Sequence, residues 1–430
     1  MVFRGQLDGR LALASVKDTS VSLAVGSHWI AAWDRGGRLY SLWKSGHTFR
    51  RGLNGRVLHK WTDHSRTGVP PAGPSPQSEP SSYDARSRVS VEGTEADALV
   101  DEASAVLRRM LDVVALDPAA WSDRSGLSPD AASLAVFERC ARFDSKAARA
   151  DADRFAEVLS PVGILPPDQY LSIVVQATEG CSFGTCTFCD LYHERYRVKP
   201  ADEFSAHAVA VRDYLGDSAL LRGRSVFLGA ANALAVPMPR LLEFLDTIER
   251  VFGGSAGWKP APGSVLPVHA FVDGFTGLHK TAADYRVLRE RGLRKVYVGL
   301  ESGHDPLLAF VRKPATSRQA VDTVRAVKDG GVSVGVIVMA GLGGRRFSEG
   351  HVADTVAAVN DMELDEGDLL YFSDLVEVPG TAYPQLAAEA DVRSLPLDDR
   401  LAQIAAIRAR LVFPAAPPRV ARYDVREFVY

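Results

Sequence analysis

The sequence predicts an α/β protein whose centre is a partial TIM-like barrel, (β/α)6, of parallel strands. The first observation is a series of short segments rich in Val, Ile and aromatic residues, at 170–177, 224–229, 267–272, 294–300, 332–340 and 367–375. The second is that a helix-like segment follows each of them, which favours parallel pairing with right-handed crossovers. A closed barrel of eight units would need two further strands, and a doubly wound sheet is the other arrangement that fits.

The chain before the barrel is expected to contain three parts. Residues 1–65 predict a small β-rich module, because short apolar runs alternate with Gly-Gly, Ser-Gly and Asn-Gly pairs typical of hairpins. Residues 66–92 are rich in Pro and Ser without apolar periodicity, which predicts a linker. Residues 93–165 space Leu, Val and Met three and four apart, which predicts a helical segment. Cys140 falls in that segment, where a small buried core thiol is the favoured interpretation.

The barrel itself is expected over residues 166–390. The remaining residues, 391–430, predict a C-terminal helix, a Pro-rich turn and an extended tail.

Composition limits the possible partners and the compartment. Hydrophobic residues make up 46% of the chain, enough for a substantial core, and the net charge of -3 argues against a general nucleic-acid or membrane surface. No run of 18 apolar residues predicts a membrane span. Four cysteines in 430 residues are too few for a secreted disulfide framework, so a cytoplasmic protein is expected.

The stretch "CSFGTCTFCD" at 181–190 carries three of those cysteines, Cys181, Cys186 and Cys189. It follows the first predicted strand, at the carboxyl edge of the sheet, where the loops of parallel α/β folds form functional sites. One interpretation is a non-catalytic zinc site completed by His193. The other is an iron-sulfur cluster, whose four irons normally take four thiolates; three cysteines leave one iron open to a ligand that binds through nitrogen and oxygen.

In this position the stretch resembles the cluster loop of the radical S-adenosylmethionine (radical SAM) superfamily. The resemblance implies that the three cysteines bind a 4Fe-4S cluster and that the amino and carboxylate groups of S-adenosylmethionine chelate the open iron. It also implies reductive cleavage to a 5'-deoxyadenosyl radical, which abstracts hydrogen from a substrate. Four residues separate Cys181 from Cys186, one more than in the commonest family spacing.

The resemblance extends to two segments near the cysteines. Phe188 matches the aromatic position that family members place against the adenine. The segment "FLGAANAL" at 227–234 stands where the family has a small-residue segment whose backbone receives the methionyl ammonium, which implies cofactor-binding roles for Gly229, Ala230, Ala231 and Asn232. An ordinary turn from strand to helix is the alternative there.

Two later segments also resemble family motifs. "VYVGLESG" at 296–303 is similar to the fourth-strand motif of the branch with methylthiotransferases and oxygen-independent coproporphyrinogen oxidases, which implies that Glu301 and Ser302 contact S-adenosylmethionine. A helix cap is the alternative for Glu301. "GVIVMAGLGG" at 335–344 resembles the adenine-binding fifth strand, with Val338 and Met339 packing the base and Gly341 allowing close backbone approach.

The resemblance covers about residues 170–390 and implies a reductant such as flavodoxin or ferredoxin as partner. The chain has no second cysteine trio, which disfavours sulfur insertion of the methylthiotransferase type. The expected substrate is a small molecule or a peptide that these motifs do not identify.

Overall fold

The computed structural model of the protein describes residues 1–62, 86–254, 265–378 and 380–430. These residues fold into two compact units. The first contains Met1–Leu159, Arg212–Gly223 and Val429–Tyr430, and the second contains Ser160–Val211 and Arg224–Phe428. The second unit therefore begins six residues before the predicted start of the barrel at residue 166.

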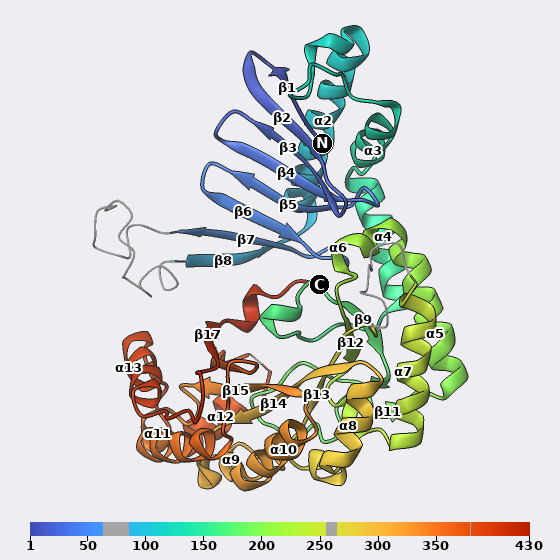
Figure 1. Ribbon diagram of the computed structural model, residues 1–430. Coiled ribbons are helices and arrows are strands. Elements are labelled where there is room, and N and C mark those ends of the chain that lie inside the picture. The colour runs from blue at the N-terminus through green and yellow to red at the C-terminus, as the bar shows by residue number, and fades with distance from the viewer. Residues whose placement is uncertain (63–85, 255–264, 379) are drawn as a thin grey trace. The chain divides into compact units, whose positions relative to one another are not determined.

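The first unit contains an antiparallel sheet in which each strand pairs with the next along the chain (Figure 1). Its strands are β1 Val2–Leu7, β2 Arg10–Val16, β3 Ser20–Val25, β4 Trp29–Asp34, β5 Leu39–Lys44, β6 His47–Arg51, β7 Val57–Thr62 and β8 Arg86–Val91. Burial alternates along β1 and β3, so one face of the sheet carries the core. The predicted hairpins of the β-rich module are confirmed.

Strand β8 lies in the stretch 66–92 that was predicted to be a linker. The prediction is wrong for residues 86–91, because Val89 and Val91 pair with His59 and Val57 of β7. This pairing spans more than 30 residues of chain, and the Pro and Ser content of the stretch gives no sign of it. The rest of the predicted linker that precedes residue 86 lies outside the described residues.

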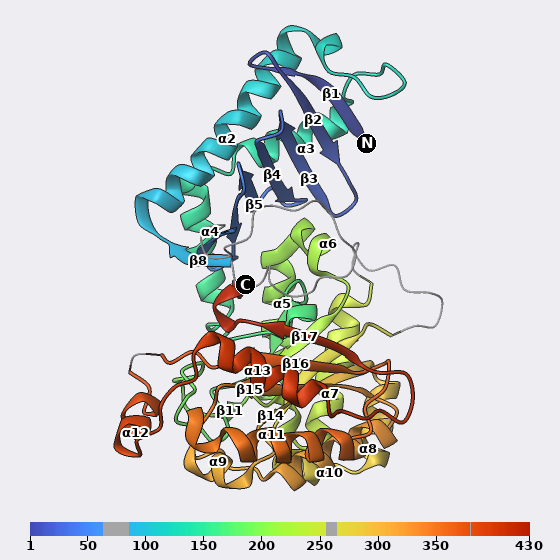
Figure 2. The same ribbon diagram turned by 90° about the vertical axis from the view of Figure 1, so that its left-hand side faces the viewer.

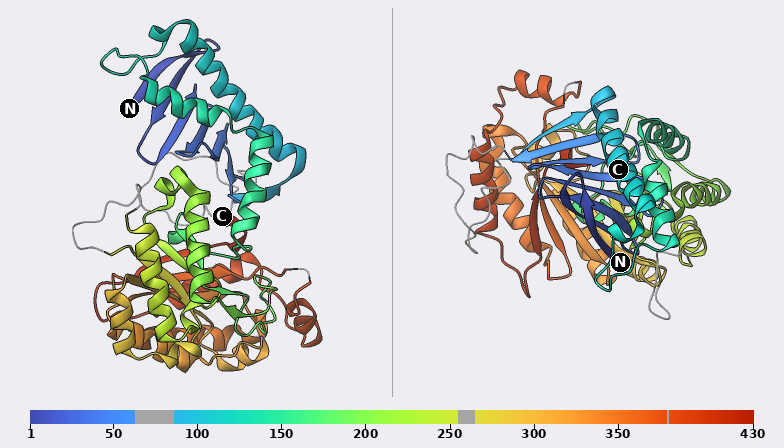
Figure 3. Two further views of the ribbon diagram at one scale, coloured as in Figure 1. Left: turned by 90° about the vertical axis from the view of Figure 1, so that its right-hand side faces the viewer. Right: turned by 90° about the horizontal axis from the view of Figure 1, so that it is seen from above.

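Helices cover the core face of this sheet. They are α2 Gly93–Leu116, α3 Ala131–Ala141 and α4 Ser145–Val158, and Figure 3 shows α2 and α3, in cyan and teal, against the blue strands. Leu107 and Met110 of α2 are fully buried in the core that the sheet and helices share. Cys140 of α3 is fully buried in the same core, and burial raises the pKa of its thiol to about 12. The interpretation of Cys140 as a core thiol is confirmed.

A buried ionic network holds residues 212–223 in the first unit. The Arg38 guanidinium donates to Asp151 of α4 at 2.8 Å through Nε, and to the backbone carbonyls of Tyr214 and Leu215 at 2.8 and 3.1 Å. Both side chains of the Arg38–Asp151 pair are less than a tenth exposed. The pair is therefore shielded from solvent.

Replacing Arg38 by alanine is expected to lower the free energy of unfolding of the apoprotein by about 3 kcal/mol, because the Asp151 charge loses a buried partner. Arg154 provides the control: it contacts the same carboxylate at 3.3 Å, but its side chain is 64% exposed. The change Arg154→Ala is expected to cost no more than about 0.5 kcal/mol. Urea denaturation of both variants measures the difference, and equal costs would contradict the buried role of Arg38.

The second unit is built on a parallel sheet whose strands follow one another in chain order. The strands are β9 Ile173–Gln176, β12 Val226–Gly229, β13 Val268–Val272, β14 Leu293–Glu301, β15 Ser333–Ala340, β16 Leu369–Asp374 and β17 Arg419–Tyr423. The first six are the six predicted strands, so the partial barrel is confirmed. Because the order never reverses, the sheet is not doubly wound. The extended tail adds β17 as a seventh strand.

The other α-helices in the described residues are α5 Ala201–Leu215, α6 Ala219–Arg222, α7 Met238–Phe252, α8 Ala282–Glu290, α9 Asp305–Phe310, α10 Ser317–Asp329, α11 Gly344–Asp361, α12 Tyr383–Glu389 and α13 Leu397–Arg408. Capping boxes at Thr281 and Thr316 fix the starts of α8 and α10. Figure 2 shows α8, α10 and α11 side by side along the outside of the sheet.

Aromatic side chains fill the middle of the barrel. The hydroxyls of Tyr297 on β14 and Tyr371 on β16 both donate to Asp168, at 2.6 and 2.9 Å, which places both side chains on the concave face. The ring centroids of Phe227 and Phe271 lie 6.0 and 5.9 Å from that of Tyr297 and 5.1 Å from each other. These buried rings close the interior, so a ligand site has to lie at the carboxyl ends of the strands.

Candidate active site

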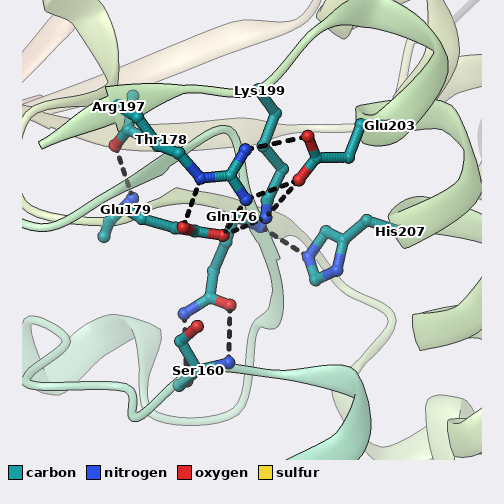
Figure 4. A network of polar contacts seen from close by, with 9 residues as sticks. Ser160, Gln176, Thr178, Glu179, Arg197, Lys199, Glu203 and His207 are labelled. Carbon is teal, nitrogen blue, oxygen red and sulfur yellow. Dashed lines mark hydrogen bonds and ion pairs between the residues drawn. The ribbon is translucent and has the colours of Figure 1, made fainter. Parts of the chain in front are cut away.

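The loop with the three cysteines is clamped at its base. Strand β10, Thr178–Glu179, pairs antiparallel with β11, Arg197–Val198, so residues 180–196 form a closed loop. Figure 4 shows the network of polar contacts beside the β10–β11 strand pair. Arg197 binds Glu179 and Glu203, each at 2.6 Å, and Lys199 binds Glu179 at 2.5 Å. Arg197 chiefly holds the pKa of Glu203 down to about 2, so both carboxylates stay charged at neutral pH.

Removing this clamp is expected to loosen the loop without unfolding the barrel. In Arg197→Met, we expect the rate of iron release from reconstituted protein to a chelator to rise about fivefold, corresponding to about 1 kcal/mol for a partly exposed ionic network. Arg212→Met is the matched control, because Arg212 has a similar exposure and, among the described residues, forms an ion pair only with its neighbour Asp213. An unchanged rate in Arg197→Met would contradict the clamp.

The four residues between Cys181 and Cys186 connect two other loops. Ser182 Oγ accepts a hydrogen bond from Asn232 at 3.0 Å, and the Phe183 ring packs edge-on against Phe275, 5.7 Å away. Thr185 donates to the backbone carbonyl of Arg312 at 3.0 Å. The unusual length of this gap thus allows the loop to span from the end of β13 to the turn after α9.

Thr187 fixes the second half of the loop. Its backbone N–H donates to the Val311 carbonyl at 3.0 Å, and its own carbonyl accepts from Tyr383 of α12 at 2.9 Å. Both partners are distant in sequence, and Thr187 is buried. The segment between Cys186 and Cys189 therefore has a defined position on the barrel.

The three thiols lie close enough to influence one another. Burial is the main cause that raises the pKa of Cys186 to about 11, and the neighbouring thiols Cys189 and Cys181 act in the same direction. A like effect raises the pKa of Cys189. Among the described residues, no three His, Cys, Asp or Glu side chains already stand in metal-binding geometry. The residue types in this loop nevertheless suit an iron-sulfur cluster, because iron in such clusters takes thiolate ligands.

The zinc interpretation required His193 as a fourth ligand. In the structure the His193 side chain is 74% exposed, and its Nε2 lies 3.4 Å from Asp190. The structure therefore gives no support to this ligand set.

Glu301 has an unusual conformation beside the thiols. Its φ of +61° lies in the left-handed region, and a β-bulge interrupts the pairing of β14 with β15 between Gly299 and Glu301. This conformation costs a side-chain-bearing residue about 1–3 kcal/mol, and such strain is concentrated at functional sites. Oε2 of Glu301 is buried without a hydrogen-bond partner in the described residues. Burial raises the pKa of the carboxyl, and Lys313 opposes that rise.

Lys313 is a site residue that the sequence did not reveal. Its Nζ lies 3.6 Å from Glu301, and both side chains are only 12–13% exposed. Burial acts to lower its pKa, but Glu301 and Cys186 outweigh burial and the pKa is raised. Lys313 lies on the turn after α9 that holds the cysteine loop, and no motif in the sequence points to it.

Asn232 connects the end of β12 to the cysteine loop and to β13. Besides Ser182, its amide donates to Thr276 Oγ1 at 2.9 Å and to the carboxylate of Asp273. Asp273 also accepts from the backbone of Phe275 and Thr276 at 2.8 and 2.6 Å. Asp273 and Thr276 were absent from the sequence prediction, and the only signal was their place after a predicted strand.

The small residues predicted to bind the cofactor also lie at this edge. Gly229 ends β12, and the N–H of Ala230 donates to Thr178 Oγ1 at 3.1 Å, beside the base of the cysteine loop. Ala231 follows and is partly exposed.

Phe188 and Met339 both pack against one apolar cluster, which contains Leu307 and Tyr383. The structure thus brings two of the predicted adenine-packing side chains together. Val338 is fully buried, and because side chains alternate along a strand it faces away from Met339 toward the helices.

Two other predicted residues are engaged by the protein itself. A side chain at Gly341 would press on Arg400, and the Gly341 N–H donates to Gln403 of α13 at 2.8 Å. Ser302 is fully buried, and its Oγ contacts His351 Nδ1 at 2.7 Å. Both residues pack the strands against the helical layer.

Comparison with known proteins finds a family model that matches part of the chain. Residues 175–357 match the family described as "Radical SAM superfamily". No curated protein matches the chain.

Similar solved structures include coproporphyrinogen III oxidase (HemN) from Escherichia coli, with 15% identity, a TM-score of 0.40, and 60% of this chain and 54% of that chain covered. The methyltransferase TsrM from Kitasatospora setae has 18% identity and a TM-score of 0.39, with 52% and 41% covered. Methylornithine synthase (PylB) has 10% identity and a TM-score of 0.38, with 77% and 79% covered. The chain thus spans about half the length of the first of these structures.

Proposed function

We propose that the protein is a radical SAM enzyme whose barrel, matched by that family over residues 175–357, holds a 4Fe-4S cluster through Cys181, Cys186 and Cys189. The observation that supports the proposal is a single loop with all three cysteines, closed at its base by β10 and β11, together with the strained, buried Glu301 at the end of β14. When bound, the cluster supplies the electron that splits S-adenosylmethionine into methionine and a 5'-deoxyadenosyl radical.

The charged groups beside the thiols are suited to bind S-adenosylmethionine. Lys313 supplies a buried cation for the carboxylate of the cofactor, and Glu301 Oε2 is a buried acceptor available to a hydroxyl or ammonium donor. Because both side chains are nearly shielded from water, their interactions with a charged ligand are stronger than on an exposed surface. The apolar cluster with Phe188 and Met339 offers a surface for the adenine.

A reductant such as flavodoxin or ferredoxin and a cytoplasmic location are parts of the same proposal. All four cysteines are unpaired, which agrees with a reducing compartment. Among the described residues, we find no helix with the length and apolar character needed to cross a membrane.

Anaerobic reconstitution with iron and sulfide tests the proposal. We expect a brown protein with visible absorbance and an EPR signal, in the reduced state, that changes when S-adenosylmethionine is added. A colourless protein that binds one equivalent of zinc and does not respond to S-adenosylmethionine would overturn it.

A further inference from the structure

A small cavity lies on the concave side of the barrel, beside the proposed cofactor site. Gly229 and Ala230 form one wall, and Tyr192, from the end of the cysteine loop, forms another. The opposite wall is the strap, residues 161–165, which contributes Pro161, Val162, Ile164 and Leu165. No charged side chain lines the cavity, so it favours an uncharged group.

The strap is fixed at one end and packed tightly in its middle. The Gln176 amide holds Ser160 through two hydrogen bonds, each of 3.0 Å, to its backbone N–H and carbonyl, as Figure 4 shows. At Gly163 an added Cβ would lie 2.9 Å from the Leu191 carbonyl and 3.3 Å from the Tyr192 ring. The strap therefore closes directly onto the cysteine loop.

Tyr192 is the polar group in this cavity that the protein leaves unused. Tyr192 follows Cys189 by three residues in the same loop, and burial is the main cause that raises the pKa of its phenol. Its hydroxyl makes no hydrogen bond within the described residues. A hydroxyl that no protein group occupies is available to donate a hydrogen bond to a ligand or to accept one from it.

We propose that this cavity is the closed form of the substrate pocket, and that the substrate places an uncharged, mainly apolar group there with one hydrogen-bonding atom on the Tyr192 hydroxyl. The inference rests on the proposed function, because it takes the neighbouring thiols and Gly229 as the cofactor side of the site. The cavity volume is about 10 Å³, which is the lower limit for one water molecule, so the strap has to move outward when the substrate enters.

Three probes with the same methylphenyl ring test the proposal: toluene, p-cresol and 4-methylbenzoate. Binding to the reconstituted full-length protein is measured anaerobically by ligand-observed NMR. We expect p-cresol to bind more tightly than toluene, and 4-methylbenzoate to bind at least about tenfold more weakly than p-cresol because the cavity offers no countercharge. Tyr192→Phe is expected to weaken the binding of p-cresol about three- to tenfold, the usual contribution of one hydrogen bond. The binding of toluene is expected to stay unchanged.

Two further variants separate the pocket from a general effect on the loop. Val162→Lys introduces a charge into the strap and is expected to weaken both p-cresol and toluene more than about tenfold. Tyr196→Phe removes a hydroxyl from the same loop but outside the cavity lining, and is expected to change neither. A weaker binding of p-cresol with unchanged binding of toluene in Tyr192→Phe would not result from a merely structural role of Tyr192.

The proposal is overturned if no probe shows saturable binding, if Tyr192→Phe weakens the two neutral probes equally or not at all, or if 4-methylbenzoate binds as tightly as p-cresol. The EPR response to S-adenosylmethionine is recorded on the same samples. If no probe binds but the EPR response to S-adenosylmethionine is present, only the substrate-pocket proposal is refuted. If p-cresol binds selectively but the EPR response is absent, only the proposed radical function is refuted.

Discussion

Cys186→Ser is expected to reduce 5'-deoxyadenosine formation from S-adenosylmethionine by more than about 100-fold. Loss of a residue that only hydrogen-bonds to a metal ligand costs up to about 100-fold, and loss of the ligand itself should cost more. The serine hydroxyl is a harder and far less acidic ligand than a thiol, so it does not replace the sulfur on iron. Anaerobic assay with a chemical reductant measures the product, and iron analysis measures the cluster.

Cys140→Ser is the matched control for this substitution. This substitution also replaces sulfur by oxygen, but in the core of the first unit, where the Cys140 thiol is fully buried. We expect full cluster content and full 5'-deoxyadenosine formation, with a stability cost of about 1–3 kcal/mol for the buried hydroxyl. Equal turnover of Cys186→Ser and wild type, or loss of the cluster in Cys140→Ser, would refute the ligand assignment.

Lys313→Met is expected to weaken S-adenosylmethionine binding by about 30-fold while leaving the cluster in place. That factor corresponds to about 2 kcal/mol, the worth of a hydrogen bond between a charged group and a carboxylate in a shielded site. Titration of the EPR change with S-adenosylmethionine gives the affinity. An affinity equal to that of wild type would show that Lys313 only neutralises Glu301.

Two further variants control for the loss of a buried ion pair. Lys328 contacts Asp365 at 2.6 Å and also pairs with Asp368, and its side chain is 17% exposed. Lys328→Met is expected to destabilise the barrel without a change in S-adenosylmethionine affinity. If Lys313→Met alone does not fold, the double variant Glu301→Gln/Lys313→Met removes both charges and restores folding, because no uncompensated carboxylate remains.

The parts of the fold that the sequence predicted are those that local pattern controls. A parallel strand buried on both faces needs an unbroken apolar run, and six such runs at regular intervals gave the strands and their order. The hairpins of the first unit were visible for a similar reason, since their turns need Gly or Asn beside short apolar runs.

Strands β8 and β17 show where local pattern is insufficient. "RSRVSV" contains only two apolar residues, and it becomes a strand because Val89 and Val91 find partners in β7. Strand β17 follows a Pro-rich turn and is ordered by β16, beside Tyr371. Pairing across such distances depends on what the rest of the chain offers, and propensity does not encode it.

The candidate site divides in the same way. The sequence by itself determined that three thiols follow the first strand of the barrel, because spacing and position are properties of one short stretch. It also pointed to Glu301 and Asn232, which the structure places beside that loop. It gave no means to distinguish Val338, which faces the helices, from Met339, which joins Phe188.

Only the tertiary structure decided which side chains surround the thiols. Thr187 meets Val311 across 124 residues, and this contact brings Lys313 to Glu301 and to the cysteine loop. The curvature of the sheet and the bulge at Glu301 turn one carboxylate inward, while the strap places Tyr192 against Gly163. The physical reason is that spacing along the chain fixes local conformation, whereas charge pairing and cavity shape depend on which segments the folded barrel brings into contact.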